Sequence, residues 1–124
     1  MILIVDDDEG MAETCSMYLK AHGFDVSVAA SGAKALSMIK GASHDLLISD
    51  CAMPGMSGVE LSETIKADPS TAQLPILLMS ASPRCEIAKG FGYGAFLRKP
   101  FLGEHLLAEV RKLLGTAHIN YSQV

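Results

Sequence analysis

The sequence predicts an α/β fold in which a parallel sheet is covered by helices on both faces. Short apolar runs alternate with segments of helical periodicity along the whole chain. Runs such as 2–5 and 46–48 are apolar throughout, which is typical of strands buried on both faces. The chain has 124 residues and a hydrophobic content of 49%, which suits one compact domain.

The first half of the chain alternates predicted strands and helices, at residues 2–5, 11–22, 24–28, 31–41 and 46–50. Gly23 can end the first helix because glycine readily adopts the left-handed conformation. Phe24, Val26 and Val28 alternate with polar residues, which predicts a half-exposed edge strand. Ser31 has the side chain of a residue that caps a helix N-terminus.

The second half continues the alternation, with elements at residues 57–68, 76–80, 83–89, 95–98 and 102–114. Ser57 and Glu60 have the spacing of a capping box. The predicted helix from Pro83 to Lys89 is short and weak, whereas the last helix has a wide apolar stripe. Every predicted strand is therefore followed by a predicted helix.

Polar side chains stand where the predicted strands end. Asp6 and Asp7 follow the first strand, Asp50 ends the third, Ser80 ends the fourth and Lys99 follows the fifth. Because right-handed crossovers bring the carboxyl ends of parallel strands to one edge, these groups should share a cleft. Three carboxylates there suit a hard cation such as Mg²⁺, whose coordination phosphate oxygens often complete.

The cluster of Asp6, Asp7, Asp8 and Glu9 divides into two parts in this interpretation. Asp6 and Asp7 face the cleft, whereas Asp8 and Glu9 belong to the start of the next helix, where the helix dipole favours acids. A bound cation would relieve the repulsion between the first two carboxylates.

Four motifs, in order along the chain, carry a resemblance to a known family: ILIVDDDE, DLLISDCAMPGMSGVEL, PILLMSAS and AFLRKPF. Together they resemble the receiver domain of two-component response regulators, the CheY-like superfamily. The resemblance implies a flavodoxin-like, doubly wound, five-stranded parallel sheet of order 2-1-3-4-5 with five helices. It places the receiver domain at residues 1–115 and a short C-terminal tail without an effector domain at 116–124.

The resemblance also implies roles for particular residues. Asp50 would accept a phosphoryl group from the phosphohistidine of a histidine kinase, and Lys99 would pair with Asp50 or its phosphoryl oxygens. Ser80 would be the switch hydroxyl and Phe96 the movable aromatic. A cis peptide bond between Lys99 and Pro100 would aim the lysine.

The resemblance implies Mg²⁺, or Mn²⁺, as cofactor. Asp7, Asp50 and the backbone carbonyl of Ala52 would bind the ion directly, and Asp6 would hold it through water. The domain would catalyse its own phosphorylation and dephosphorylation without being a turnover enzyme.

The expected partners are a sensor histidine kinase or a histidine phosphotransfer protein and a downstream protein or effector domain. Phosphorylation would change the surface formed by the helix at 83–89, the strand at 95–98 and the last helix. The resemblance leaves open a dimer that forms on phosphorylation.

Charge and composition exclude other classes. The net charge of −4 argues against direct nucleic-acid binding, and no apolar segment is long enough for a membrane span. The three scattered cysteines predict reduced thiols in a cytoplasmic protein, and the four histidines lack metal-ligand spacing.

Three alternatives remain open at this point. DDDEG loosely resembles the DxDGT motif of haloacid-dehalogenase-like aspartate phosphatases, with Asp6 as nucleophile and Asp8 as acid, although the threonine is absent. A flavodoxin shares the topology, but an acidic first loop would repel FMN phosphate. A receiver that signals independently of phosphorylation is the third.

The sequence also departs from the family pattern in one respect, because the interval from Ser80 to Lys99 is shorter than is usual in receivers.

Overall fold

A computed structural model describes residues 1–81, 95–101 and 103–123, and gives 116–123 by their backbone. The helix expected at 83–89, Cys85 and the shortened interval between Ser80 and Lys99 lie largely outside these residues.

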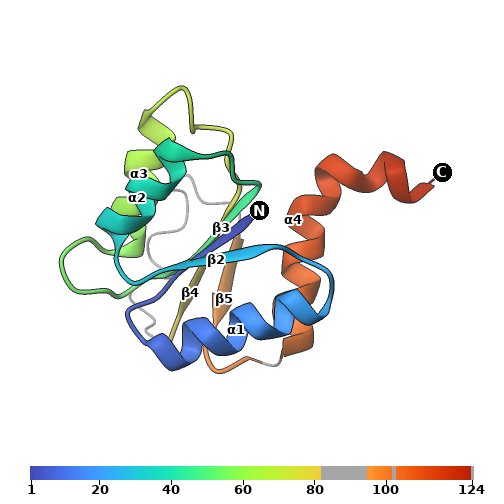
Figure 1. Cartoon of the computed structure of the whole chain (residues 1–124), viewed down its shortest axis with the longest axis horizontal. Coiled ribbons are helices and arrows are strands. Elements are labelled where there is room, and N and C mark those ends of the chain that lie inside the picture. The colour runs from blue at the N-terminus through green and yellow to red at the C-terminus, as the bar shows by residue number, and fades with distance from the viewer. Residues whose placement is uncertain (82–94, 102, 124) are drawn as a thin grey trace.

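The sheet consists of five parallel strands in the order β2-β1-β3-β4-β5 (Figure 1). The strands are β1 (Ile2–Val5), β2 (Val26–Ala29), β3 (Leu46–Asp50), β4 (Ile76–Ser80) and β5 (Ala95–Arg98). In the central register Ile4 lies between Val28 of β2 and Ile48 of β3. The expected order is confirmed, and the carboxyl ends of all five strands lie at one edge.

Helices cover both faces of the sheet (Figure 1). The described residues contain four: α1 (Glu9–Ala21), α2 (Gly32–Gly41), α3 (Gly58–Ala67) and α4 (Gly103–Gln123). α1 and α4 pack on one face, and α2 and α3 pack on the other. The doubly wound arrangement is therefore confirmed.

Alternate residues of each central strand enter two separate cores. Ile2 and Ile4 of β1 pack in the core under α1 and α4, while Leu3 and Val5 pack in the core under α2 and α3. None of the four is more than 2% exposed. Burial on both faces explains why the sequence of β1 is apolar throughout.

The helix ends follow the predicted capping signals. Gly23 has a φ of +94°, and the N–H groups of Gly23 and Phe24 donate to carbonyls in the last turn of α1 at 3.0 and 3.1 Å. These bonds make a Schellman motif. At the start of α3, Ser57 and Glu60 form the predicted capping box.

α1 and α4 approach closely where α4 begins. A β-carbon built on Gly103, the first residue of α4, would lie 2.7 Å from the ring of Tyr18 in α1. A side chain at position 103 would therefore force the Tyr18 ring to shift.

Several details differ from expectation. β2 begins at Val26, and Val28, expected to share the buried face of Val26, is 43% exposed because an edge strand is only partly covered. α4 continues to Gln123, well past the end of its apolar stripe.

Cys15 is free, but Cys51 is disulfide-bonded, so the expectation of reduced thiols is wrong for Cys51.

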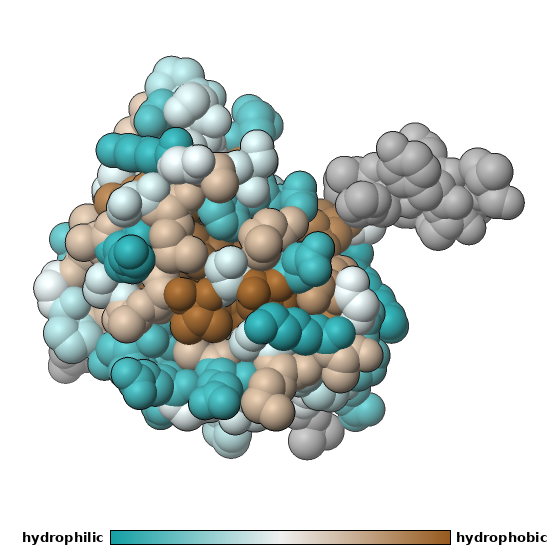
Figure 2. All heavy atoms as spheres, viewed as in Figure 1, coloured by the Kyte–Doolittle hydropathy of each residue, from teal (hydrophilic) through white to brown (hydrophobic). Residues whose placement is uncertain are grey.

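The surface carries few large apolar side chains. In the described part of the chain, Met1, Met17 and Val28 are the exposed ones. Figure 2 shows hydrophilic side chains around most of the visible face, with strongly apolar ones gathered near its middle. Within the described ranges no helix has the length and hydropathy to cross a bilayer.

Candidate functional site

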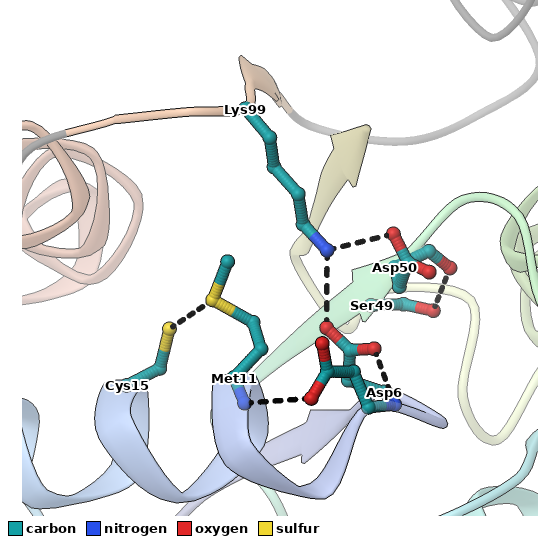
Figure 3. A network of polar contacts seen from close by, with 7 residues as sticks. Asp6, Met11, Cys15, Ser49, Asp50 and Lys99 are labelled. Carbon is teal, nitrogen blue, oxygen red and sulfur yellow. Dashed lines mark hydrogen bonds and ion pairs between the residues drawn. The ribbon is translucent and has the colours of Figure 1, made fainter. Parts of the chain in front are cut away.

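Charged side chains from three strands converge at the carboxyl edge of the sheet. Asp6 and Asp7 follow β1, Asp50 is the last residue of β3 and Lys99 follows β5. Figure 3 shows Asp6, Asp50 and Lys99 pointing toward one another. The structure thus brings together the groups that the sequence placed at separate strand ends.

The ammonium of Lys99 lies between two carboxylates (Figure 3). Its Nζ donates to Asp50 Oδ1 at 3.1 Å and to Asp6 Oδ2 at 3.2 Å. The side chains are 16% exposed for Lys99, 11% for Asp50 and 1% for Asp6. The contact with Asp50 agrees with the expected pairing. The contact with Asp6 was not expected, because the sequence does not show how far the lysine reaches across the edge.

Burial and charge act in opposite directions on the two partners. Burial raises the pKa of Asp50, and the hydrogen bond from Lys99 offsets part of that rise. Burial would lower the pKa of Lys99, but its hydrogen bonds and charge interactions with Asp50 and Asp6 outweigh burial and raise that pKa. Lys99 is therefore a fixed positive charge, and Asp50 is a carboxylate that further positive charge would stabilise.

The acidic cluster after β1 divides as the sequence suggested. Asp8 Oδ1 accepts a hydrogen bond from the Met11 N–H at 3.2 Å, which makes Asp8 the N-cap of α1. Glu9 lies in the first turn of the same helix. Asp6 instead turns into the site, where its Oδ1 also accepts from the Asp8 N–H at 3.0 Å.

Three carboxylates have the arrangement of a cation site. Asp6, Asp7 and Asp50 each offer an oxygen, and these oxygens lie within 4.8 Å of one another. Asp7 is exposed, whereas Asp6 and Asp50 are buried. An all-oxygen set of high negative charge fits Mg²⁺ or Mn²⁺ better than it fits a soft metal.

The remaining predicted residues surround this cluster. Ser80 ends β4 and is 2% exposed, Phe96 in β5 is half-buried against the core under α2 and α3, and Ala52 is exposed beyond β3. The Lys99 N–H donates to the Ser80 carbonyl at 2.9 Å, which joins the ends of β4 and β5. The Lys99–Pro100 bond is cis, as expected.

Two residues that the sequence analysis left outside the site contact the backbone of Asp50. Ser49 Oγ donates to the Asp50 carbonyl at 2.9 Å, and Gly58 packs against the same carbonyl. The available signal was a serine inside the apolar strand LLISD, because a buried hydroxyl usually needs a partner.

The response regulator receiver domain is the family whose model matches this chain, over residues 2–111. The chain belongs to this family. A receiver is not a turnover enzyme, and membership of this family sets aside both the phosphatase and the flavodoxin alternatives. The cluster of Asp6, Asp7 and Asp50 is typical of the receiver magnesium site.

Curated relatives include longer regulators. The DNA-binding response regulator MtrA of Mycobacterium tuberculosis is 34% identical over 116 residues, which are 91% of this chain and 50% of MtrA. The phosphate regulon transcriptional regulatory protein PhoB of Rhizobium meliloti is 34% identical over 119 residues, 94% of this chain and 52% of PhoB. The chain therefore spans about half the length of these relatives.

Solved receiver structures have the same fold. The receiver domain of a signal transduction histidine kinase from Syntrophus aciditrophicus has a TM-score of 0.87 and 30% identity, covering 93% of this chain and 89% of that one. The chemotaxis response regulator CheY4 of Vibrio cholerae has a TM-score of 0.84 and 32% identity, covering 90% and 96%.

Proposed function

We propose that this receiver is a phosphorylation-dependent switch in which Asp50 accepts a phosphoryl group. The observation that carries the proposal is the convergence of the Lys99 ammonium, 3.1 Å from Asp50 Oδ1, with the oxygens of Asp6 and Asp7 beside Asp50. The donor would be the phosphohistidine of a sensor histidine kinase or of a histidine phosphotransfer protein.

The reaction needs positioning and charge. An oxygen of the Asp50 carboxylate forms a bond to phosphorus while the phosphorus–nitrogen bond of the donor breaks, and the imidazole leaves with a proton from solvent. The transferring group spreads negative charge over its equatorial oxygens, so the Lys99 ammonium stabilises the transition state. After transfer, the Lys99 ammonium would pair with the phosphoryl oxygens in place of the Asp50 carboxylate.

Asp7, Asp50 and the Ala52 carbonyl would hold Mg²⁺ or Mn²⁺ directly, and Asp6 would hold it through water. The ion supplies positive charge next to the transferring oxygens. Because Asp7 is exposed, the ion would reach the site from solvent. Its charge would offset the free-energy cost of burying the carboxylates of Asp6 and Asp50.

The switch would pass from Ser80 to Phe96. Phosphoryl oxygens on Asp50 offer the Ser80 hydroxyl a new acceptor, and its movement would let Phe96 rotate inward. Phe96 has no hydroxyl, so it would signal by packing alone. The changed surface would include β5, α4 and the segment at 83–89, and would control a downstream protein or effector domain.

The proposed setting is the cytoplasm, where a sensor kinase presents its phosphohistidine. The relatives MtrA and PhoB are named as DNA-binding or transcriptional regulators and are about twice as long. We propose that residues 1–115 form the receiver and that its output passes through another protein or domain. A dimer formed on phosphorylation is one form this output could take.

Incubation with Mg²⁺ and acetyl phosphate, followed by intact mass measurement, tests the proposal. The expected result is the added mass of one phosphoryl group, absent from Asp50→Asn and absent in EDTA. A phosphoryl group that persists in Asp50→Asn would overturn the assignment of Asp50. No transfer from acetyl phosphate or from a panel of phosphorylated histidine kinases would favour the receiver that signals independently of phosphorylation.

A further inference from the structure

Ser49 lies directly before Asp50 and is fully buried. Its Oγ donates a hydrogen bond to the carbonyl oxygen of Asp50 at 2.9 Å (Figure 3), and the residue is 0% exposed. Ser49 points into the core under α2 and α3, since its neighbours in register are Val5 and Leu78 of that core. The hydroxyl is thus a polar group in an apolar core, and it is turned toward the phosphoacceptor backbone.

The peptide units that follow Asp50 are held from several sides. The Cys51 N–H donates to the Met79 carbonyl, and the Cys51 carbonyl accepts from the Gly58 N–H, both at 2.8 Å. A β-carbon built on Gly58 would clash with the Asp50 carbonyl oxygen. The Asp50 carbonyl therefore lies between the hydroxyl of Ser49 and the backbone of Gly58.

We propose that Ser49 is a positioning residue for phosphoryl transfer, an inference that rests on the proposed function of Asp50. The peptide unit between Asp50 and Cys51 fixes the direction in which the Asp50 side chain leaves the strand. The Ala52 carbonyl, the proposed backbone ligand of the ion, follows this peptide unit along the chain, so its position depends on the orientation of the unit. By fixing this unit, Ser49 sets the position of two site groups without touching substrate.

Small errors of position are costly in this chemistry, because an in-line attack tolerates little displacement. A hydroxyl-to-carbonyl hydrogen bond has a net value of about 0.5–1.5 kcal/mol. If the stabilisation by this hydrogen bond is lost from the reactive arrangement of Asp50, the rate of phosphorylation falls about twofold to tenfold.

Two variant pairs isolate the hydroxyl. Ser49→Ala is compared with Ser62→Ala, because Ser62 is also a 0% exposed serine but its Oγ has no partner in the described residues. Ser49→Thr is compared with Ser49→Val, which has nearly the same shape without the hydroxyl. Any cost of added volume is then common to both members of the second pair.

The experiment uses the full chain, saturating Mg²⁺ and acetyl phosphate, with initial rates from intact mass and melting temperatures from circular dichroism. Ser49→Ala should be phosphorylated about twofold to tenfold more slowly than wild type, Ser62→Ala at the wild-type rate, and Ser49→Thr faster than Ser49→Val by a similar factor. Equal rates for wild type and Ser49→Ala, or for Ser49→Thr and Ser49→Val, would overturn the inference. A wild-type chain that is not phosphorylated at Asp50 instead refutes the proposed function, so the two failures are distinguishable.

Discussion

Two partly buried lysines lie at opposite ends of the sheet and meet different partners. At the carboxyl edge, the Lys99 ammonium contacts the carboxylates of Asp50 and Asp6. Near the amino edge, the Lys66 ammonium donates to the backbone carbonyls of Ala72 and Leu74 at 2.9 and 3.0 Å. Burial acts on both lysines, but the carboxylates of Asp50 and Asp6 outweigh it and raise the pKa of Lys99, whereas burial lowers the pKa of Lys66.

The two lysines therefore have different roles: Lys99 belongs to a functional site, whereas Lys66 stabilises a loop. Lys66 satisfies carbonyls of the connection between α3 and β4, and its contacts need no further ligand. Lys99 balances two carboxylates while a third, Asp7, stands beside them, so the net charge of these four groups is negative. That remaining charge distinguishes a cluster prepared for a cation from a lysine that stabilises a loop.

Removal of the Lys99 ammonium should have the largest effect. Lys99→Met leaves two buried carboxylates without their cation, and we expect the free energy of unfolding to fall by about 3 kcal/mol in EDTA at neutral pH. Urea unfolding measures this loss, and added Mg²⁺ should recover part of it. A stability equal to wild type in EDTA would mean that water already screens the carboxylates.

Magnesium should stabilise the wild type through the exposed carboxylate of the cluster. At a concentration one hundred times the dissociation constant, a ligand of the native state adds about 2.7 kcal/mol to the free energy of unfolding. Asp7→Asn should lose most of this gain, whereas Glu9→Gln, altered in the first turn of α1, should keep it. Melting temperatures with and without Mg²⁺ measure both, and equal behaviour of the two variants would show that the division of the acids is wrong.

Asp50→Asn should make the metal-free protein more stable at neutral pH. Because the pKa of Asp50 is raised by burial, the native state binds its proton more tightly than the unfolded chain does. Wild-type stability in EDTA therefore falls, relative to Asp50→Asn, as pH rises from below 3.8 through the native pKa, and the gap then stays constant. Urea unfolding at a series of pH values measures the difference in stability between the two proteins, and a difference that is the same at every pH would contradict this.

Lys66→Met should have the smallest effect and serves as the control for Lys99→Met. It removes two hydrogen bonds to carbonyls but leaves the methylene packing, and water can reach the freed carbonyls in part, so we expect a loss of about 1–2 kcal/mol. Its response to Mg²⁺ and its phosphorylation by acetyl phosphate should match wild type. A reduced response to Mg²⁺ would mean that the two ends of the sheet are coupled.

Much of the fold was accessible from local sequence signals. The apolar strands, the capping box at Ser57 and the glycine that ends α1 depend on neighbouring residues, and all were predicted correctly. The carboxyl-edge cluster was predicted because a parallel sheet gathers its strand ends. What the sequence did not show depends on contacts between distant segments, such as the reach of Lys99 to Asp6, the exposure of Val28 and the bonding of Cys51.

The close approach of α1 and α4 has a practical consequence for protein engineering. Position 103 has room for a hydrogen atom where any side chain would meet the ring of Tyr18. A library that varies residues after Lys99 to change partner choice should therefore keep Gly103 constant, or vary it together with Tyr18. Otherwise a side chain at position 103 would move the Tyr18 ring, and a change in binding could not be assigned to the varied residues alone.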